Sequence, residues 1–168
     1  MLCVIAKIDP ASRDRLLRVQ RVAGDFGVPE RPLYGHITLA AYIGGVEDAF
    51  ISSCKAILSG HDKFPVVYDR IEVLLATSII VASPRKDGPM AAIYREIARS
   101  WEADFNDWTR ADIWHPHTTL VHDPTADLNA IARAMQENFQ PFTAQVERIE
   151  FSRVLETGYE IVDLLELN

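Results

Sequence analysis

Residues 36–39 read HITL and residues 117–120 read HTTL, so the tetrapeptide His-x-Thr-Leu occurs twice in the chain. From the chain's own composition, about 0.02 copies of this pattern are expected by chance. Each copy begins a segment that is typical of a strand, and each is followed by apolar residues at helical spacing. The two copies therefore predict equivalent strands in two similar halves of one fold.

A second pair of similar segments supports this duplication. Residues 69–73 read DRIEV and residues 147–151 read ERIEF, at nearly the same separation as the two motifs. The repeated order of elements is β-α-β-α-β-β, and residues 106–115, which have no clear pattern, are interpreted as a loop. Periodicity and turn residues predict strands at 4–8, 36–42, 64–76, 78–83, 117–122, 142–155 and 159–167, and helices at 11–26, 46–58, 87–105 and 126–139.

This order of elements indicates the α+β class. At 168 residues, with 48% hydrophobic side chains, the chain is long enough to bury a core and short enough to form one unit. We expect two pseudo-symmetric lobes, each a mainly antiparallel sheet with helices on its outer face, that face each other across a central groove. Residues 1–168 are expected to form a single bilobal domain.

Composition argues against several classes of protein. A net charge of −7 does not favour the basic face that binding of long nucleic acids requires. The opening residues lack the pattern of a signal peptide and no apolar stretch is long enough to span a bilayer, so no membrane partner is expected. Cys3 and Cys54 have no CxxC spacing, which favours buried free thiols in a reducing compartment and a cytoplasmic location.

The motif residues divide between the two faces of their strands. Successive side chains on a strand alternate, so His36 and Thr38 share one face. The same parity places His117 and Thr119 together, whereas Thr118 turns inward, where its hydroxyl requires a backbone partner. If a pseudo-twofold axis relates the halves, two imidazoles and two hydroxyls meet at one point.

Such a constellation suits chemistry on a phosphodiester. Attack on phosphorus requires removal of a proton from the incoming oxygen and delivery of a proton to the leaving oxygen, and imidazole does either near neutrality. Hydroxyl donors directed at the non-bridging oxygens stabilise the charge of the transition state. The sequence therefore predicts a catalytic set of His36, His117, Thr38 and Thr119.

The paired motifs, Pro116 before the second motif and the doubled order of elements resemble the two-histidine phosphoesterase superfamily. Within it, the chain is most similar to the 2′-5′ RNA ligase and 2′,3′-cyclic phosphodiesterase branch, over essentially its whole length. The resemblance implies acid and base roles for the two histidines, phosphate binding by the two threonines, and no metal or other cofactor. One departure is His122, at a position where the family often has an arginine.

The function implied is hydrolysis of 2′,3′-cyclic phosphodiesters of nucleotides or RNA ends, or of related small cyclic phosphates. The partner is then a small cyclic nucleotide or an RNA terminus. Ligation or transesterification by the same residues, with an RNA hydroxyl in place of water, remains an alternative, as does a non-catalytic nucleotide-phosphate binding module. A metal site at His115, His117, His122 and Asp123 is not expected, because His122 has the opposite parity and no HExxH or cysteine set accompanies it.

Aromatic residues precede both motifs. Tyr34 and Trp114 are predicted to bind substrate by stacking on a base, with packing at the end of the sheet as the equal alternative. Trp101 and Trp108 are expected to pack around the second lobe. No phosphate contact is assigned to the scattered cations Lys7, Arg31 and Arg153.

Overall fold

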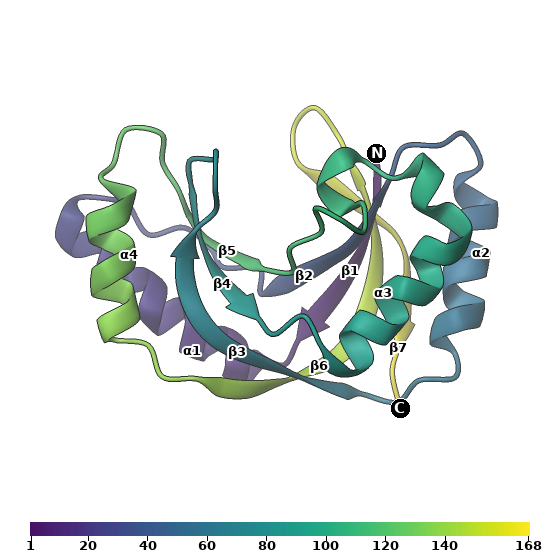
Figure 1. Ribbon diagram of the computed structural model, residues 1–168, viewed down its shortest axis with the longest axis horizontal. Coiled ribbons are helices and arrows are strands. Elements are labelled where there is room, and N and C mark those ends of the chain that lie inside the picture. Colours follow the sequence, from purple (N-terminus) through teal and green to yellow (C-terminus); the bar gives the residue numbers. More distant parts are fainter.

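The computed structural model describes residues 1–168 as four α-helices, three 3₁₀ helices and one seven-stranded sheet (Figure 1). The predicted α+β class is confirmed, and the predicted hairpins are present. The strands are β1 (Leu2–Ile8), β2 (His36–Tyr42), β3 (Phe64–Val73), β4 (Ile79–Pro84), β5 (Thr118–His122), β6 (Phe142–Val154) and β7 (Tyr159–Glu166). The helices are α1 (Pro10–Gln20), η1 (Arg21–Phe26), α2 (Glu47–Leu58), α3 (Gly88–Trp101), η2 (Glu102–Asp104), η3 (Asp107–Thr109) and α4 (Leu128–Glu137).

All strand pairings are antiparallel, and the strand order is β2-β1-β6-β3-β4-β5. The long strand β6 pairs with β1 along one edge and with β3 and then β7 along the other. Pairing of β6 with β3, from Phe64↔Val146 to Tyr68↔Phe142, joins β2-β1-β6 to β3-β4-β5. The sheets expected for the two lobes are therefore one continuous sheet, with a motif strand at each end.

Helices cover one face of this sheet. Helices α1 and α4 lie at one end of the molecule and α2 and α3 at the other (Figure 1). Leu2, Val4 and Ala6 alternate along β1 and belong to the main hydrophobic core with apolar residues of all four helices. Helix α1 begins where the side chain of Asp9 accepts a hydrogen bond of 2.8 Å from the Ser12 amide, an N-cap that satisfies one otherwise free donor.

The two outermost strands, β2 and β5, are brought together by side chains. The Trp114 indole donates to the carbonyl oxygen of Thr38 at 3.0 Å, and the Thr118 hydroxyl donates to that of His36 at 2.8 Å. Thr118 is 1% exposed and also bonds the hydroxyl of Tyr68 at 2.6 Å. The predicted need of Thr118 for a backbone partner is thus met by the first motif, and the two motif strands are neighbours in space (Figure 1).

Other sequence expectations concern the cysteines and the helices. Cys3 and Cys54 are both buried free thiols, as predicted. No helix combines the length and the apolar character required to cross a bilayer.

Candidate active site

The first motif lies on the sheet face opposite the main helix-packed core, which we call the site face. His36 and Thr38 are half-buried, whereas Ile37 and Leu39 between and after them are fully buried in that core. Lys7 of β1 pairs with His36, so its side chain shares this face. The alternation predicted for the first motif is confirmed.

The second motif has the same arrangement. His117 directly precedes β5 and, like Thr119, is half-buried, whereas Thr118 and Leu120 are buried. The hydroxyls of Thr38 and Thr119 make no hydrogen bond to the protein, and neither is buried without a partner. Both hydroxyls are therefore free to donate to a ligand on the site face.

His36 is held in its neutral form. Burial, the positive charge of Lys7 and the nearby His117 together lower the pKa of His36 to about 4, against a smaller opposing effect of Glu150. Its Nδ1 is buried and has no hydrogen-bond partner. An imidazolium carries a proton on both ring nitrogens, so a charged His36 would bury an N–H group without an acceptor.

His117 differs at the same ring atom. Its Nδ1 lies 2.7 Å from the carbonyl oxygen of His115, to which it donates. Burial lowers the pKa of His117, but this hydrogen bond favours the protonated form and opposes the shift. A proton on Nδ1 also directs Nε2 toward the site, where it is available for proton transfer.

A charged pair supports each motif histidine. Near His36, the Arg148 guanidinium donates to Glu150 Oε1 at 2.8 Å, and the Tyr34 hydroxyl donates to Glu150 Oε2 at 2.5 Å. Glu150 is 1% exposed, so its charge is buried and paired. Burial and this carboxylate raise the pKa of the Tyr34 hydroxyl, which therefore remains a donor.

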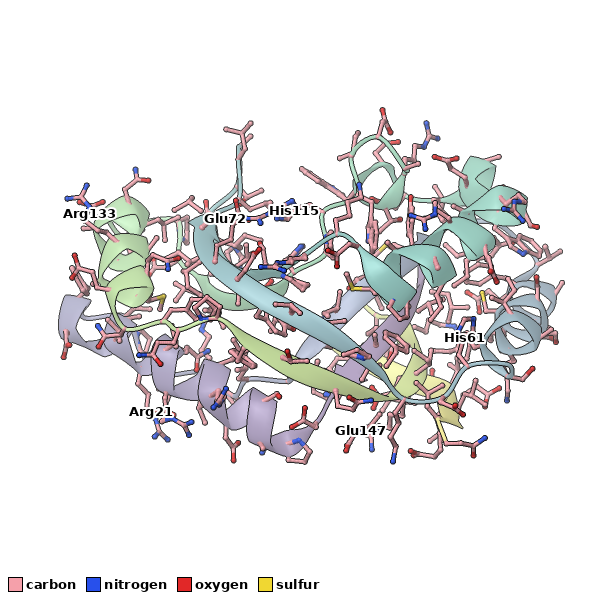
Figure 2. All side chains as sticks on the ribbon, turned by 60° about the horizontal axis from the view of Figure 1, so that its bottom comes forward. Arg21, His61, Glu72, His115, Arg133 and Glu147 are labelled. Atoms are coloured by element: carbon pink, nitrogen blue, oxygen red, sulfur yellow. The ribbon has the colours of Figure 1, made fainter.

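Near His117, the equivalent pair is Arg70 and Glu72. Arg70 Nε donates to Glu72 Oε1 at 3.0 Å, and His115 Nε2 lies 3.0 Å from the same oxygen; Figure 2 shows Glu72 and His115 close together. Burial would raise the pKa of Glu72, but hydrogen bonds from Ser83 and Arg70 lower it overall. Each motif histidine thus has a nearby arginine-carboxylate pair, and the carboxylate of that pair bonds the residue two positions before the histidine.

Tyr34 and His115 lie two positions before the motif histidines, and their carbonyl oxygens accept hydrogen bonds from different groups. In the second half the His115 carbonyl accepts from the motif histidine itself. In the first half the Tyr34 carbonyl accepts from Lys7 Nζ, which also lies 3.1 Å from the centre of the Tyr34 ring. His36 makes no bond to this carbonyl, and its Nδ1 has no partner. Burial lowers the pKa of Lys7 to about 8.

The aromatic residues predicted to bind substrate lie in different environments. The Tyr34 ring packs edge-on against His36, with ring centres 5.4 Å apart, and against Tyr159 at 5.3 Å. Trp114 is 2% exposed and stacks on Tyr94 with ring centres 3.8 Å apart. The structure supports the packing alternative for Trp114, because a buried ring has no face free for a base.

Trp108 was expected to pack around the second lobe, and this prediction is wrong. Its side chain is 62% exposed and lines a cavity of about 500 Å³ together with His115 and His117. Trp101, which was expected to pack around the second lobe as well, is half-buried but packs edge-on against Phe50 of α2, in the first half of the chain. Trp108 lies in a segment without periodicity. In such a segment tertiary contacts decide whether a side chain faces the core, and the sequence pattern does not predict them.

The other charged and metal-ligating residues lie outside this arrangement. His122 is exposed at the far end of β5, opposite Ile79. No three or more histidine, cysteine, aspartate or glutamate side chains are grouped so as to hold a metal ion. Arg153 is paired with Glu47 at 2.7 Å and lies opposite Leu2, at the other end of β1 from Lys7.

Sequence reasoning missed Lys7, Glu72 and Glu150 as members of the site. A signal for the carboxylates was present, because each is the fourth residue of the repeated segments DRIEV and ERIEF. Lys7 was considered only as one of several scattered cations, and its pairing with His36 across β1 and β2 is what places it at the site.

Comparison with known proteins gives a family and a fold. A family model described as the 2′-5′ RNA ligase superfamily matches residues 9–158. No curated protein sequence gives a significant match.

Solved structures match the whole chain at low sequence identity. E. coli LigT in its apo form is 15% identical, with a TM-score of 0.63 over 99% of this chain and 96% of LigT. E. coli LigT complexed with 3′-AMP is 16% identical over the same shares, with a TM-score of 0.58. TT0787 of Thermus thermophilus is 13% identical, with a TM-score of 0.61 over 99% of this chain and 97% of that one. At these identities the likeness establishes a shared fold.

Proposed function

Because the chain belongs to the 2′-5′ RNA ligase superfamily of two-histidine phosphoesterases, we propose that it hydrolyses 2′,3′-cyclic phosphodiesters without a metal ion. The proposed substrates are cyclic nucleotides, RNA ends with a cyclic phosphate, or related small cyclic phosphates. LigT has been crystallised with 3′-AMP, ATP and NADP⁺. These three ligands are nucleotides, and the substrates proposed for the present chain belong to the same chemical class.

The observation that carries the proposal is the meeting of the two motifs. The Thr118 hydroxyl bonds the His36 carbonyl, so the strands that carry the two histidines are in direct contact. His36 is also close enough to His117 for a charge on one to lower the pKa of the other. Two imidazoles and two unpaired hydroxyls on one face are the groups that acid-base cleavage of a phosphodiester requires.

The difference between the imidazoles assigns their roles in this proposal. His36, which is neutral before the reaction, acts as the general base: its Nε2 takes a proton from the attacking water, because Nδ1 is buried, and the imidazolium that forms is transient. The water oxygen forms a bond to phosphorus while one ribose oxygen leaves. His117, with its Nδ1 proton bonded to the His115 carbonyl, is the protonated partner and delivers its Nε2 proton to that leaving oxygen.

The product is a phosphomonoester with a free hydroxyl on the ribose, and exchange of protons with solvent restores both histidines. Thr38 and Thr119 donate to the non-bridging oxygens and stabilise their charge in the transition state. Lys7 acts through His36, because its positive charge favours the neutral imidazole. Lys7 is therefore a positioning residue in this mechanism.

The experiment is turnover of 2′,3′-cyclic nucleotides in the presence of excess chelator, with products identified by phosphorus NMR. Release of a 2′- or 3′-monophosphate is expected, and His36→Ala and His117→Ala should each slow it roughly 10²- to 10⁴-fold. Activity that is lost with chelator and restored by one divalent metal would contradict the metal-free mechanism. A protein that binds the nucleotide and gains thermal stability, yet releases no product, would be a binding module.

Ligation is separated from hydrolysis in the same assay. With an RNA 5′-hydroxyl acceptor present, an RNA fragment that ends in a cyclic phosphate yields either a hydrolysed end or a 2′-5′ linked product. We expect the hydrolysed end to dominate, and a dominant linked product would assign the chain to the ligase alternative.

A further inference from the structure

A cavity of about 500 Å³ lies beside His117, a volume typical of small-molecule sites. One wall is the turn between β3 and β4, which contributes Leu75. The other wall is the segment that leads into β5, which contributes Trp108 and Ile113. His115 and His117 complete the lining, so the cavity is continuous with the proposed catalytic site.

The walls expose an unusual amount of apolar surface. Leu75 is 89% exposed, Trp108 62% and Ile113 49%. Large apolar side chains gathered in one exposed patch are costly in water and mark a binding surface. No lysine, arginine, aspartate or glutamate lines the cavity. The cavity therefore suits the uncharged part of a ligand whose phosphate lies at the histidines.

The Trp108 ring is exposed, but its backbone is fixed. The Asn106 side chain accepts a hydrogen bond of 3.1 Å from the Trp108 amide, and the Asn106 amide donates to the Ala41 carbonyl at 2.7 Å. On the other side of Trp108, the Thr109 hydroxyl accepts from the Ala41 amide at 3.1 Å, and Tyr94 donates to the Thr109 carbonyl at 2.8 Å. Because the backbone is already fixed, only the side-chain torsions of Trp108 lose freedom when a ligand binds.

We propose that Trp108 stacks on the nucleobase of the substrate while the cyclic phosphate lies between His36 and His117. This inference rests on the proposed function. A nucleobase is flat and uncharged and is joined through one ribose to the phosphate, and tryptophan offers the largest aromatic face for it. Stacking of one base on an aromatic side chain contributes roughly 1–3 kcal/mol.

The cavity recognises the face of the base and not its edge. The one hydroxyl in the lining, that of Thr77, already donates to the Leu74 carbonyl at 2.7 Å. Every nucleobase presents a π-face, whereas discrimination between bases requires hydrogen bonds to their edges. Adenine, guanine, cytosine and uracil substrates are therefore accepted with similar efficiency.

The test compares substrates with and without a base. For the four 2′,3′-cyclic nucleotides, Trp108→Ala should lower kcat/KM roughly 5- to 150-fold, mainly by raising KM. This range is the stacking free energy expressed as a ratio of rates. For glycerol 1,2-cyclic phosphate, which has no base, it should change nothing. Trp108→Phe should restore most of the loss. The matched control is Phe26→Ala, at an aromatic residue that is 45% exposed and does not line the cavity, and it should behave as wild type.

A binding measurement separates this inference from the proposed function. Trp108→Ala should weaken calorimetric binding of adenosine 2′-monophosphate and leave that of glycerol 2-phosphate unchanged, whether or not the protein turns over. If wild type hydrolyses cyclic nucleotides but Trp108→Ala affects both substrates equally, the inference is wrong and the function stands. If wild type hydrolyses none, the function is wrong, and the inference stands only on the selective loss of nucleotide binding. More than about 100-fold preference for one base also overturns recognition by stacking alone.

Discussion

The Thr118 hydroxyl donates a hydrogen bond of 2.8 Å to the carbonyl oxygen of His36, and it lies 2.6 Å from the Tyr68 hydroxyl. One buried side chain of the second motif therefore satisfies the backbone of the first. The adjacent Thr119 is half-buried and makes no hydrogen bond to the protein. Two neighbouring threonines of one motif thus have different partners, which makes their contributions separable by experiment.

Thr118→Val should destabilise the fold by about 1–3 kcal/mol, because it leaves the His36 carbonyl and the Tyr68 hydroxyl without their partner. Thr119→Val is the matched control, since it makes the same replacement one residue away. It should change stability by less than about 0.5 kcal/mol and lower the rate on the order of 10- to 1,000-fold. Urea unfolding and initial rates on one cyclic nucleotide measure both effects. Equal losses of stability in the two variants would contradict these assignments.

A plot of the rate against pH should be bell-shaped, with its maximum on the acid side of neutrality. The productive state has His36 neutral and His117 protonated. The rate should therefore rise with pH through the His36 pKa of about 4 and fall as pH increases through the His117 pKa, which lies below its usual value. Because the two groups are coupled, the limbs report apparent values of the pair. The measurement is kcat/KM for a cyclic nucleotide between about pH 3 and 9.

Lys7→Met should move the rising limb of that bell to higher pH, because the charge that lowers the His36 pKa is removed. Lys7→Arg retains the charge and should move it less. A simple loss of folding would reduce the amplitude of the profile without moving its limb. An unmoved limb in a folded Lys7→Met protein would show that Lys7 does not act through His36.

The sequence predicted most of the architecture because local patterns determine it. The alternation of polar and apolar residues fixed the faces of both motif strands, and the duplicated segments fixed the order of elements. The pairing of β6 with β3, which makes one sheet of the two halves, was not predictable, because strand partners distant in sequence leave no local pattern.

The site was predictable where a repeated motif marked it. The difference between the two histidines was not, because it depends on which group bonds the carbonyl oxygen two residues before each of them: Lys7 bonds that of Tyr34, and His117 bonds that of His115. The tryptophans show the same limit. Trp108 and Trp114 both belong to a segment without periodicity, and tertiary contacts bury the second and expose the first.

The low pKa of His36 should also make the fold less stable in acid. Unfolded, a histidine titrates near its ordinary value of 6.5, whereas folded His36 titrates at about 4. Between these values the unfolded chain binds one more proton, so stability falls as pH decreases from 6.5 to 4, by on the order of 3 kcal/mol in total. His36→Gln should remove this part of the slope in urea midpoints measured at several pH values. His122→Gln, at an exposed histidine, should retain the wild-type slope.

The division of labour between the histidines is tested with the leaving group. His36→Ala and His117→Ala should each lower the rate roughly 10²- to 10⁴-fold, the usual contribution of one acid or base. The double variant should lose less than the two losses combined, because a base without its acid partner is already ineffective. A phosphodiester with a nitrophenolate leaving group requires no proton donor. It should therefore rescue His117→Ala, which lacks the acid, and not His36→Ala, which lacks the base. Rescue of His36→Ala alone would exchange the two roles, and rescue of both or neither would make the histidines phosphate-binding groups.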